Sequence, residues 1–308
     1  MNYGPLLFLG AFFALAASWF GFVLTPQIQL GQLQQTNTVP AGVIYPLGRP
    51  GFAREGLEVY RANGCAYCHS QQVGQTGTTC NVVLDQPGTN PPALIEAILK
   101  VVPLESQSRA RELLTGLPKP VLEGLGKEAA DAAAKTLSVD GAKASVWIVP
   151  AGPDIARGWA KRRTVAEDFL FDSPVMLGAR RIGPDLANVG VRLPDARWHL
   201  RHLYAPRAEV KGSVMPPYGF LFERRRIERA RSPDALDLPP VAAPEPGYEI
   251  VPTREARALA AYLVSLQADA PLFVAPLTVP APVTPEGTNA APGSAAATNA
   301  LATNSPAR

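Results

Sequence analysis

The first 48 residues of the chain are apolar or uncharged, and the first charged side chain is Arg49. Within them, residues 5–24, PLLFLGAFFALAASWFGFVL, form one continuous apolar run. Twenty helical residues span about 30 Å, the thickness of a bilayer's hydrocarbon core. An A-x-A site at residues 14–16 lies inside the run and no basic segment precedes it, which disfavours a cleaved signal peptide. We therefore expect a membrane anchor over residues 1–27.

A second pattern occupies residues 79–152, where short β-rich runs alternate with amphipathic ones. Two runs rich in β-branched residues predict strands, a proline-containing run predicts a short edge strand or turn, and three runs predict helices. The strands are expected at 81–85 and 144–149, the edge strand or turn at 117–124, and the helices at 91–102, 104–116 and 126–141. The expected order is β-α-α-β-α-β, which is a small α/β unit.

Charge and composition narrow the possibilities further. The net charge of +3 gives no reason to expect nucleic acid, and three cysteines do not make a disulfide framework. After residue 274 only Glu286 and Arg308 are charged, and this Pro/Ala/Thr/Asn-rich segment has little to bury. We therefore expect a disordered tail over residues 275–308. Basic runs at 157–163 and 224–231 indicate either a solvated or headgroup-facing surface or a site for an acidic partner.

Candidate chemistry is concentrated in the segment Cys65-Ala-Tyr-Cys68-His69. C-x-x-C-H is the attachment pattern of c-type haem, in which the two thiols add to the haem vinyl groups and the histidine binds iron. A redox dithiol is the first alternative, and it usually accompanies a βαβ pattern in a cytosolic protein. A zinc site is the second, and it would need two further ligands. The helical spacing of residues 54–64, with a glycine at the end, favours one covalent haem.

The second axial ligand of such a haem has several candidates. Met215 lies in SVMPPYG, where two prolines stiffen the loop, and thioether ligation suits electron transfer. Met176 is the rival, with core packing as the alternative interpretation. His199 and His202 lie three residues apart on an expected helix, and we expect them to bond to backbone, propionate or water rather than to a metal.

Several segments, in this order, resemble a known family: GLEVYRANGCAYCHSQQV (56–73), FLFDSPVMLGARRIGPDLANVG (169–190), WHLRHLYAPR (198–207), SVMPPYGFL (213–221) and REARALAAYLVSLQ (254–267). Together they resemble the membrane-anchored monohaem subunit II of cbb3-type cytochrome c oxidases, over residues 1–78 and 157–270. The resemblance implies a mainly α fold, with a single transmembrane helix and a class I cytochrome c-like domain at 28–78 and 153–274. The α/β unit at 79–152 interrupts this domain.

The resemblance also implies roles for individual residues. Cys65 and Cys68 carry the thioethers, His69 is the proximal ligand, Pro184 orients its ring through a carbonyl, and Met215 is the distal ligand. Arg180, Arg181, Trp198 and Arg207 match positions near the haem edge or at subunit contacts. The family usually has a tryptophan where Met176, Leu177 and Gly178 stand here, so one packing contact of the family is in doubt.

The function implied is electron transfer from a donor cytochrome, through one haem c, to the catalytic subunit of a haem–copper oxidase, with a further c-type subunit as partner. The chain alone is not expected to reduce oxygen. Because haem c is attached outside the bacterial cytoplasmic membrane, the N-terminus should be cytoplasmic and the haem domain periplasmic. A free-standing membrane-anchored carrier and the monohaem subunit of nitric oxide reductase are the alternatives. A third alternative is a docking protein in which the haem has only a structural role.

Residues 79–152 resemble the C-terminal domain of the bacterial ribosomal stalk protein, most clearly in ARELLTGLPKPVLEGLGKEAADAAAKTL (110–137). The factor-binding pattern of that protein is not matched in residues 101–113. A docking or shielding role and an inert insertion at a surface loop both remain open. Cys80, at the start of this unit, is expected to be a buried small side chain, with a reactive thiol or an intermolecular bridge as alternatives.

Overall fold

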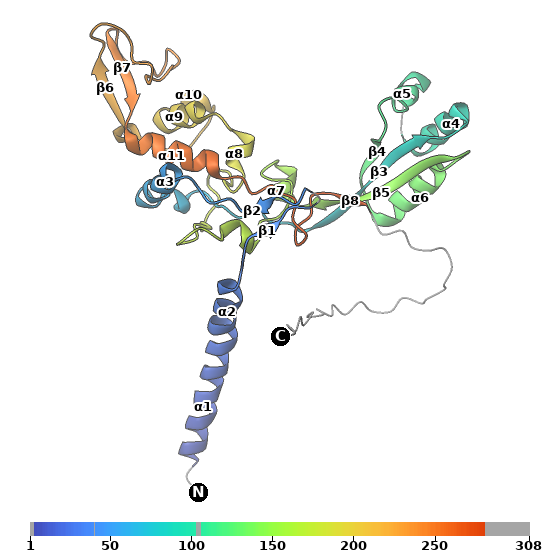
Figure 1. Cartoon of the computed structure of the whole chain (residues 1–308), viewed down its shortest axis with the longest axis horizontal. Helices are drawn as coiled ribbons and strands as arrows, with labels where there is room; N and C mark the ends of the chain where they lie inside the picture. Colours follow the sequence, from blue (N-terminus) through green and yellow to red (C-terminus); the bar gives the residue numbers. More distant parts are fainter. Residues whose placement is uncertain (1–2, 40, 103–105, 281–308) are drawn as a thin grey trace, which may run out of the picture.

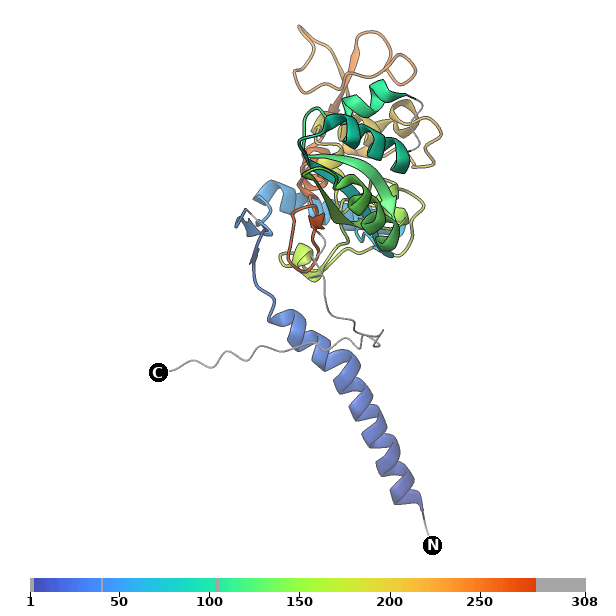
Figure 2. The same ribbon diagram turned by 90° about the vertical axis from the view of Figure 1, so that its right-hand side faces the viewer.

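The computed structural model describes residues 3–39, 41–102 and 106–280. Its first element is one continuous helix made of α1 (Gly4–Trp19), the π-helical turn η1 (Phe20–Leu24) and α2 (Thr25–Gly31). This helix projects away from the rest of the chain, and none of its residues is buried (Figures 1 and 2). Among the described residues it is the one helix long and apolar enough to cross a membrane, as the sequence predicts.

A helical unit forms the part of the fold that holds the C-x-x-C-H motif. Its longer helices pack around a core of leucine, valine, alanine and tyrosine side chains. The helices are α3 (Gly51–Ala62), η2 (Cys65–Tyr67), α7 (Pro153–Ala156), η3 (Ala166–Phe169), α8 (Val189–Arg192), α9 (Ala196–Tyr204), α10 (Pro206–Glu209), η4 (Gly219–Leu221) and α11 (Arg254–Ser265). The first and last long helices, α3 and α11, are neighbours although about 200 residues separate them (Figure 1).

The close crossing of α3 and α11 depends on their apolar faces. Leu57 and Tyr60 of α3 are buried at helical spacing, and Tyr262 of α11 meets Tyr60 with ring centroids 5.3 Å apart. At the crossing point, a side chain at Gly56 would collide with the carbonyl group of Ala258. Glycine at this position therefore lets the two helix backbones touch.

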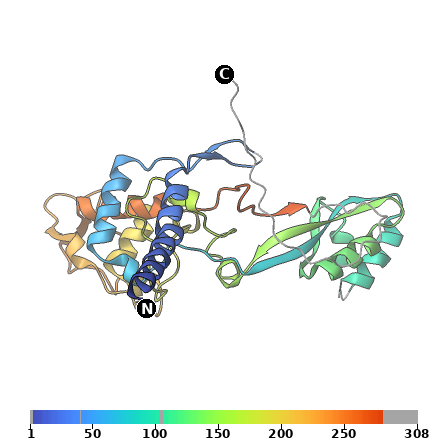
Figure 3. The same cartoon turned by 90° about the horizontal axis from the view of Figure 1, so that it is seen from below.

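The interrupting unit has the predicted element order β-α-α-β-α-β. It consists of β3 (Gly77–Pro87), α4 (Pro91–Val101), α5 (Gln107–Glu112), β4 (Lys119–Leu125), α6 (Lys127–Leu137) and β5 (Ala142–Ala151). β3 is the central strand, paired antiparallel with β4 on one side and β5 on the other. The helices lie on one face of this sheet (Figure 3) and bury a core of their own. Residues 103–105, inside the second expected helix, lie outside the described residues.

Short strands occur outside this unit as well, so the whole chain is a mixed α and β structure. β1 (Thr36–Asn37) pairs with β2 (Ile44–Tyr45), and β6 (Phe222–Arg226) forms a hairpin with β7 (Tyr248–Pro252). β6 contains the first residues of the basic run at 224–231.

The first residues of the expected tail are built into the fold. Ala275 is 2% exposed, and β8 (Val279–Pro280) adds a fourth strand to the sheet by pairing with β5 at Trp147 and Ile148. The segment departs from expectation at residues 275–280 because the free edge of β5 offers its backbone hydrogen-bonding groups there. Residues 281–308 lie outside the described residues.

Candidate functional site

The C-x-x-C-H motif follows α3 through a sharp turn. Gly64 has φ +65°, a backbone conformation that glycine adopts without strain, and it reverses the chain before the single turn η2. The backbone N–H of His69 then donates to the carbonyl of Cys65 at 3.0 Å, which closes the motif into a compact loop. Cys65 and Cys68 are half-buried free thiols. Burial raises the pKa of Cys65 to about 11, so this thiol stays protonated at neutral pH.

The imidazole of His69 is held by the segment Gly183–Pro184. Nδ1 of His69 lies 2.8 Å from the carbonyl oxygen of Pro184, and because a carbonyl only accepts, Nδ1 carries the proton. Nε2 therefore keeps its lone pair, which is the form of histidine that binds a metal. Burial lowers the pKa of His69, which also favours the neutral ring. Any side chain at Gly183 would collide with this ring.

The ring of His69 faces a mostly apolar cavity inside the helical unit. Met215 reaches the same cavity from the loop between α10 and η4, together with Cys65 and Pro184. Met176 packs against the surrounding core but is not among the residues that line the cavity. Of the two methionine candidates, the fold therefore brings Met215 together with His69.

Both histidines of α9 also line this cavity, and they differ in their bonding. His199 is buried, with its Nε2 2.8 Å from the carbonyl of Leu193. His202 stacks its ring on Trp198, with centroids 4.9 Å apart and planes 8° from parallel. Burial, together with the nearby His69 and His199, lowers the pKa of His202 to about 4, so its ring is neutral.

Polar atoms without partners are concentrated at the cavity wall. In the described part of the chain, the buried side-chain atoms that lack a hydrogen bond include Nδ1 of His202, Nε of Arg192 and the hydroxyl of Tyr60. All three residues line the cavity. A buried polar atom without a partner is costly, so three around one cavity indicate a polar group that belongs there. Sequence reasoning missed Arg192 and Tyr60 as cavity residues, because no local pattern in the sequence marks them.

A network of hydrogen-bonded charged and polar groups connects the C-x-x-C-H motif to the two ends of the inserted unit. Arg181 donates from Nε to the hydroxyl of Ser70 at 3.0 Å and from Nη1 to Asp154 at 2.9 Å. Asp154 follows β5 and also accepts from the backbone N–H of Gly74, just before β3. Ser70 donates to the fully buried Asp185. Arg181 therefore fixes residues from both sides of the insertion.

The other residues singled out by resemblance are dispersed. Trp198 lines the cavity, whereas Arg180 is exposed. Arg207 donates from Nε to the carbonyl of Ser213 at 3.3 Å, which supports the loop that carries Met215. Cys80 is buried in the core of the inserted unit at 5% exposure, as expected for a small packed side chain.

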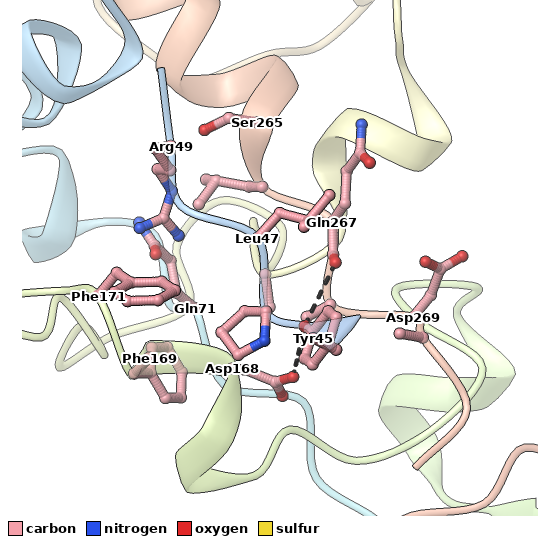
Figure 4. A pocket seen from close by; sticks show the side chains of 15 residues that line it. Tyr45, Leu47, Arg49, Gln71, Asp168, Phe169, Phe171, Ser265, Gln267 and Asp269 are labelled. Carbon is pink, nitrogen blue, oxygen red and sulfur yellow. Dashed lines mark hydrogen bonds between the residues drawn. The ribbon is translucent and has the colours of Figure 1, made fainter. Parts of the chain in front are cut away.

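A second hollow, of about 230 Å³, lies where the segment after the membrane helix meets the helical unit (Figure 4). Asp168 accepts from the hydroxyl of Tyr45 at 2.7 Å and from Nη2 of Arg162 at 2.8 Å. Arg162 is fully buried, so this ion pair is shielded from water. Leu47 and Phe171 lie at the same hollow. The Tyr45, Arg162 and Asp168 groups at this hollow are paired with one another, which indicates a structural junction.

Within the described residues, no group of three or more His, Cys, Asp or Glu side chains is arranged to hold a metal ion. Residues 161–238 match the family described as cytochrome c oxidase, mono-heme subunit/FixO. The resemblance read from the motifs is thereby confirmed over the part of the helical unit that contributes Pro184, His202 and Met215.

The second resemblance is confirmed by curated relatives. A stretch of 69 residues, 22% of this chain, is 44% identical to the large ribosomal subunit protein bL12 of Burkholderia thailandensis, of which it covers 55%. The corresponding proteins of Cupriavidus metallidurans and Paracidovorax citrulli are 41% and 42% identical over 69 residues, with 55% and 54% covered. The chain therefore spans about half the length of these relatives, in its inserted α/β unit.

Proposed function

We propose that this chain is the electron-transfer subunit of a cbb3-type haem–copper oxidase and carries one covalent haem c. The observation that carries the proposal is the convergence of Cys65, His69 and Met215 on one cavity. The match of residues 161–238 to the monohaem subunit family supports it independently. On this proposal, residues 28–78 and 153–274 form a class I cytochrome c-like domain around that cavity.

The residues present fit a haem c. Cys65 and Cys68 are reduced and precede His69 at the attachment spacing, and the Nδ1–H tautomer leaves Nε2 of His69 free to bind iron. The apolar walls suit a porphyrin, and the unpaired Nε of Arg192 and Nδ1 of His202 suit its charged carboxylate edge. Bound haem c would supply a one-electron redox centre.

The protein's own contribution is to hold and tune that centre. The carbonyl of Pro184 fixes the orientation and tautomer of His69. The loop bearing Met215 is held by the bond from Arg207 to Ser213, and a thioether ligand raises a haem potential. The mostly apolar lining would surround a bound haem with few polar groups, which would favour its reduced, less charged state.

The membrane placement follows from the anchor and the attachment chemistry. We propose a single-pass protein of the bacterial cytoplasmic membrane, with a cytoplasmic N-terminus and a periplasmic haem domain. Its partners would be the catalytic subunit, where oxygen is reduced, and a further c-type cytochrome. The inserted unit at 79–152 would serve in docking or shielding in this complex.

Purification of the tagged protein from its native membrane in mild detergent tests the proposal. A reduced-minus-oxidised spectrum with haem c and haem b, and a co-purifying large multi-span subunit, is the expected result. If the preparation contains haem c but no partner subunit, the protein is a free-standing electron carrier and the proposal is wrong. A preparation without covalent haem would overturn it altogether.

A further inference from the structure

Asp154 is a buried carboxylate at the point where the inserted unit returns to the helical unit. It lies in α7, three residues after the end of β5, and is 2% exposed (Figure 1). Its Oδ2 accepts from the backbone N–H of Gly74 at 2.8 Å, and its Oδ1 accepts from Nη1 of Arg181 at 2.9 Å. A buried carboxylate is unfavourable unless it is paired and hydrogen-bonded, so its position depends on these partners. Asp154 lies outside both ranges, 1–78 and 157–270, over which the sequence resembles the monohaem subunits.

Arg181 connects this carboxylate to the haem-attachment motif. Its Nε donates to the hydroxyl of Ser70 at 3.0 Å, and Ser70 directly follows His69. Its Nη2 donates to the carbonyl of Gln72. The guanidinium also lies over the ring of Trp159, 5.4 Å from the ring centroid. Because arginine presents its donors in a rigid planar fork, a partner that fixes one end of the fork also orients the other end.

Ser70 connects Arg181 to the segment that holds the imidazole of His69. The hydroxyl of Ser70 donates to Oδ2 of Asp185 at 2.5 Å, and Asp185 is fully buried. Asp185 directly follows Pro184, whose carbonyl accepts from Nδ1 of His69 at 2.8 Å. The chain of side-chain hydrogen bonds therefore ends beside the bond that orients the imidazole.

A second arginine beside Asp154 offers an internal comparison. Nη1 of Arg157 lies 3.6 Å from Oδ1 of Asp154, and the Arg157 side chain is 58% exposed. Arg157 and Arg181 are therefore two cations on the same carboxylate, of which Arg181 also bonds Ser70. Exposed ion pairs contribute little and are screened by salt. Variants of the two arginines can therefore separate the effect of charge near Asp154 from the effect of the chain of bonds.

We infer that Asp154 is a positioning residue for His69 and that it acts through Arg181 and Ser70. The inference rests on the proposed function, and it gives the segment that leaves the inserted unit a part in supporting the haem-binding histidine. The carboxylate holds the guanidinium of Arg181 in the orientation that reaches Ser70. Without the carboxylate the guanidinium is free to turn, and the segment that contains Pro184 loses one of its restraints.

The expected effect of removing the carboxylate is a higher reduction potential of the bound haem. Oxidation adds one positive charge to the iron, so a negative charge in buried surroundings favours the ferric state. A histidine whose Nδ1–H is firmly bonded to a carbonyl is the more basic ligand, which also favours ferric iron. Asp154→Asn weakens both contributions, so the two changes have the same sign. We expect the ferrous-to-ferric ratio at a fixed applied potential to rise about threefold to tenfold, which is about 30 to 60 mV for a one-electron couple.

The test is a redox titration of the haem c absorption band in the full-length tagged protein from its native membrane. Asp154→Asn removes the charge but keeps the size of the side chain and an oxygen that can accept from Gly74. The same change is made in an Arg181→Gln background, where we expect it to leave the potential unchanged, because Arg181 transmits the effect. Arg157→Gln is the matched control and should keep the wild-type potential, since its charge is exposed.

The readouts separate folding, function and positioning. Haem staining and the Met–Fe absorption band should be unchanged in Asp154→Asn. An unchanged or lowered potential in that variant would overturn the inference. So would an equal rise in both backgrounds, because Asp154 would then act on the haem through space and not through Arg181.

Two further outcomes have a defined meaning. If Asp154→Asn loses covalent haem, the conservative variant Asp154→Glu is measured. Restored haem at the wild-type potential would support the positioning role, whereas continued loss would show that Asp154 serves only the fold and would overturn the inference. A wild-type protein without covalent haem would contradict the proposed function itself.

Discussion

Nδ1 of His69 donates a hydrogen bond to the carbonyl oxygen of Pro184 at 2.8 Å, and this contact joins residues 115 positions apart. The entire inserted unit lies between them in the chain. The proximal side of the cavity therefore depends on the insertion bringing its two ends back together.

Replacing Gly183 by alanine should push the ring of His69 out of position, because the new Cβ would occupy the same space as the imidazole. We expect a loss of covalent haem, or haem with an altered spectrum, measured by haem staining and by the reduced spectrum. Gly219→Ala is the control, since nothing lies within 4 Å of a Cβ there. Normal haem incorporation in Gly183→Ala would contradict the geometry.

The double variant Cys65→Ala/Cys68→Ala should lose the haem signal on a denaturing gel, because no thiol remains to form a thioether. Cys80→Ala should keep the full signal, since Cys80 is packed in the core of the inserted unit. Retention of covalent haem in the double variant would show that the motif does not attach it.

Met215→Leu should abolish the red-edge absorption band of Met–Fe ligation in the oxidised protein and lower the reduction potential. Met176→Leu should keep the band, because Met176 packs against the surrounding core and does not line the cavity. The two variants are matched in chemistry and volume. If the band disappears in Met176→Leu and persists in Met215→Leu, the distal ligand is Met176 and the assignment to Met215 is wrong.

Asp168→Asn should destabilise the fold by about 3–5 kcal/mol, because it leaves the fully buried Arg162 without its carboxylate. Asp131→Asn, which breaks the exposed pair with Lys127, should cost at most about 0.5 kcal/mol. Chemical unfolding in detergent measures both. Equal effects of the two changes would mean that the Arg162–Asp168 pair is reached by water.

Local patterns were sufficient for much of the fold. The apolar run predicted the N-terminal helix, and alternation of β-rich and amphipathic runs predicted the order β-α-α-β-α-β of the insertion. These features depend on residues that are near one another in the chain. The short strands β6 and β7 were missed because the basic run at 224–231 has no alternation of apolar and polar residues. The pairing of β6 with Tyr248–Pro252 also depends on residues more than 20 positions away in the chain.

The part of the site that lies within one short sequence motif was predictable. Cys65, Cys68 and His69 follow from five consecutive residues. The shared cavity of Met215 and His69 and the contact with Pro184 needed a family resemblance or a fold, since no local pattern relates those positions. Arg192 and Tyr60 could not be found in advance, because an unpartnered polar atom exists only once its surroundings are packed.

The pairing of β8 with β5 has a consequence for how the inserted unit would behave if it were separated from the rest of the chain. Residues 77–151 alone would expose the edge of β5 at Trp147 and Ile148, where Val279 and Pro280 now pair. An open strand edge invites pairing between molecules. Residues from beyond the helical unit therefore cover this edge of the inserted sheet, and a version of the unit cut at residue 151 would leave it open to another chain.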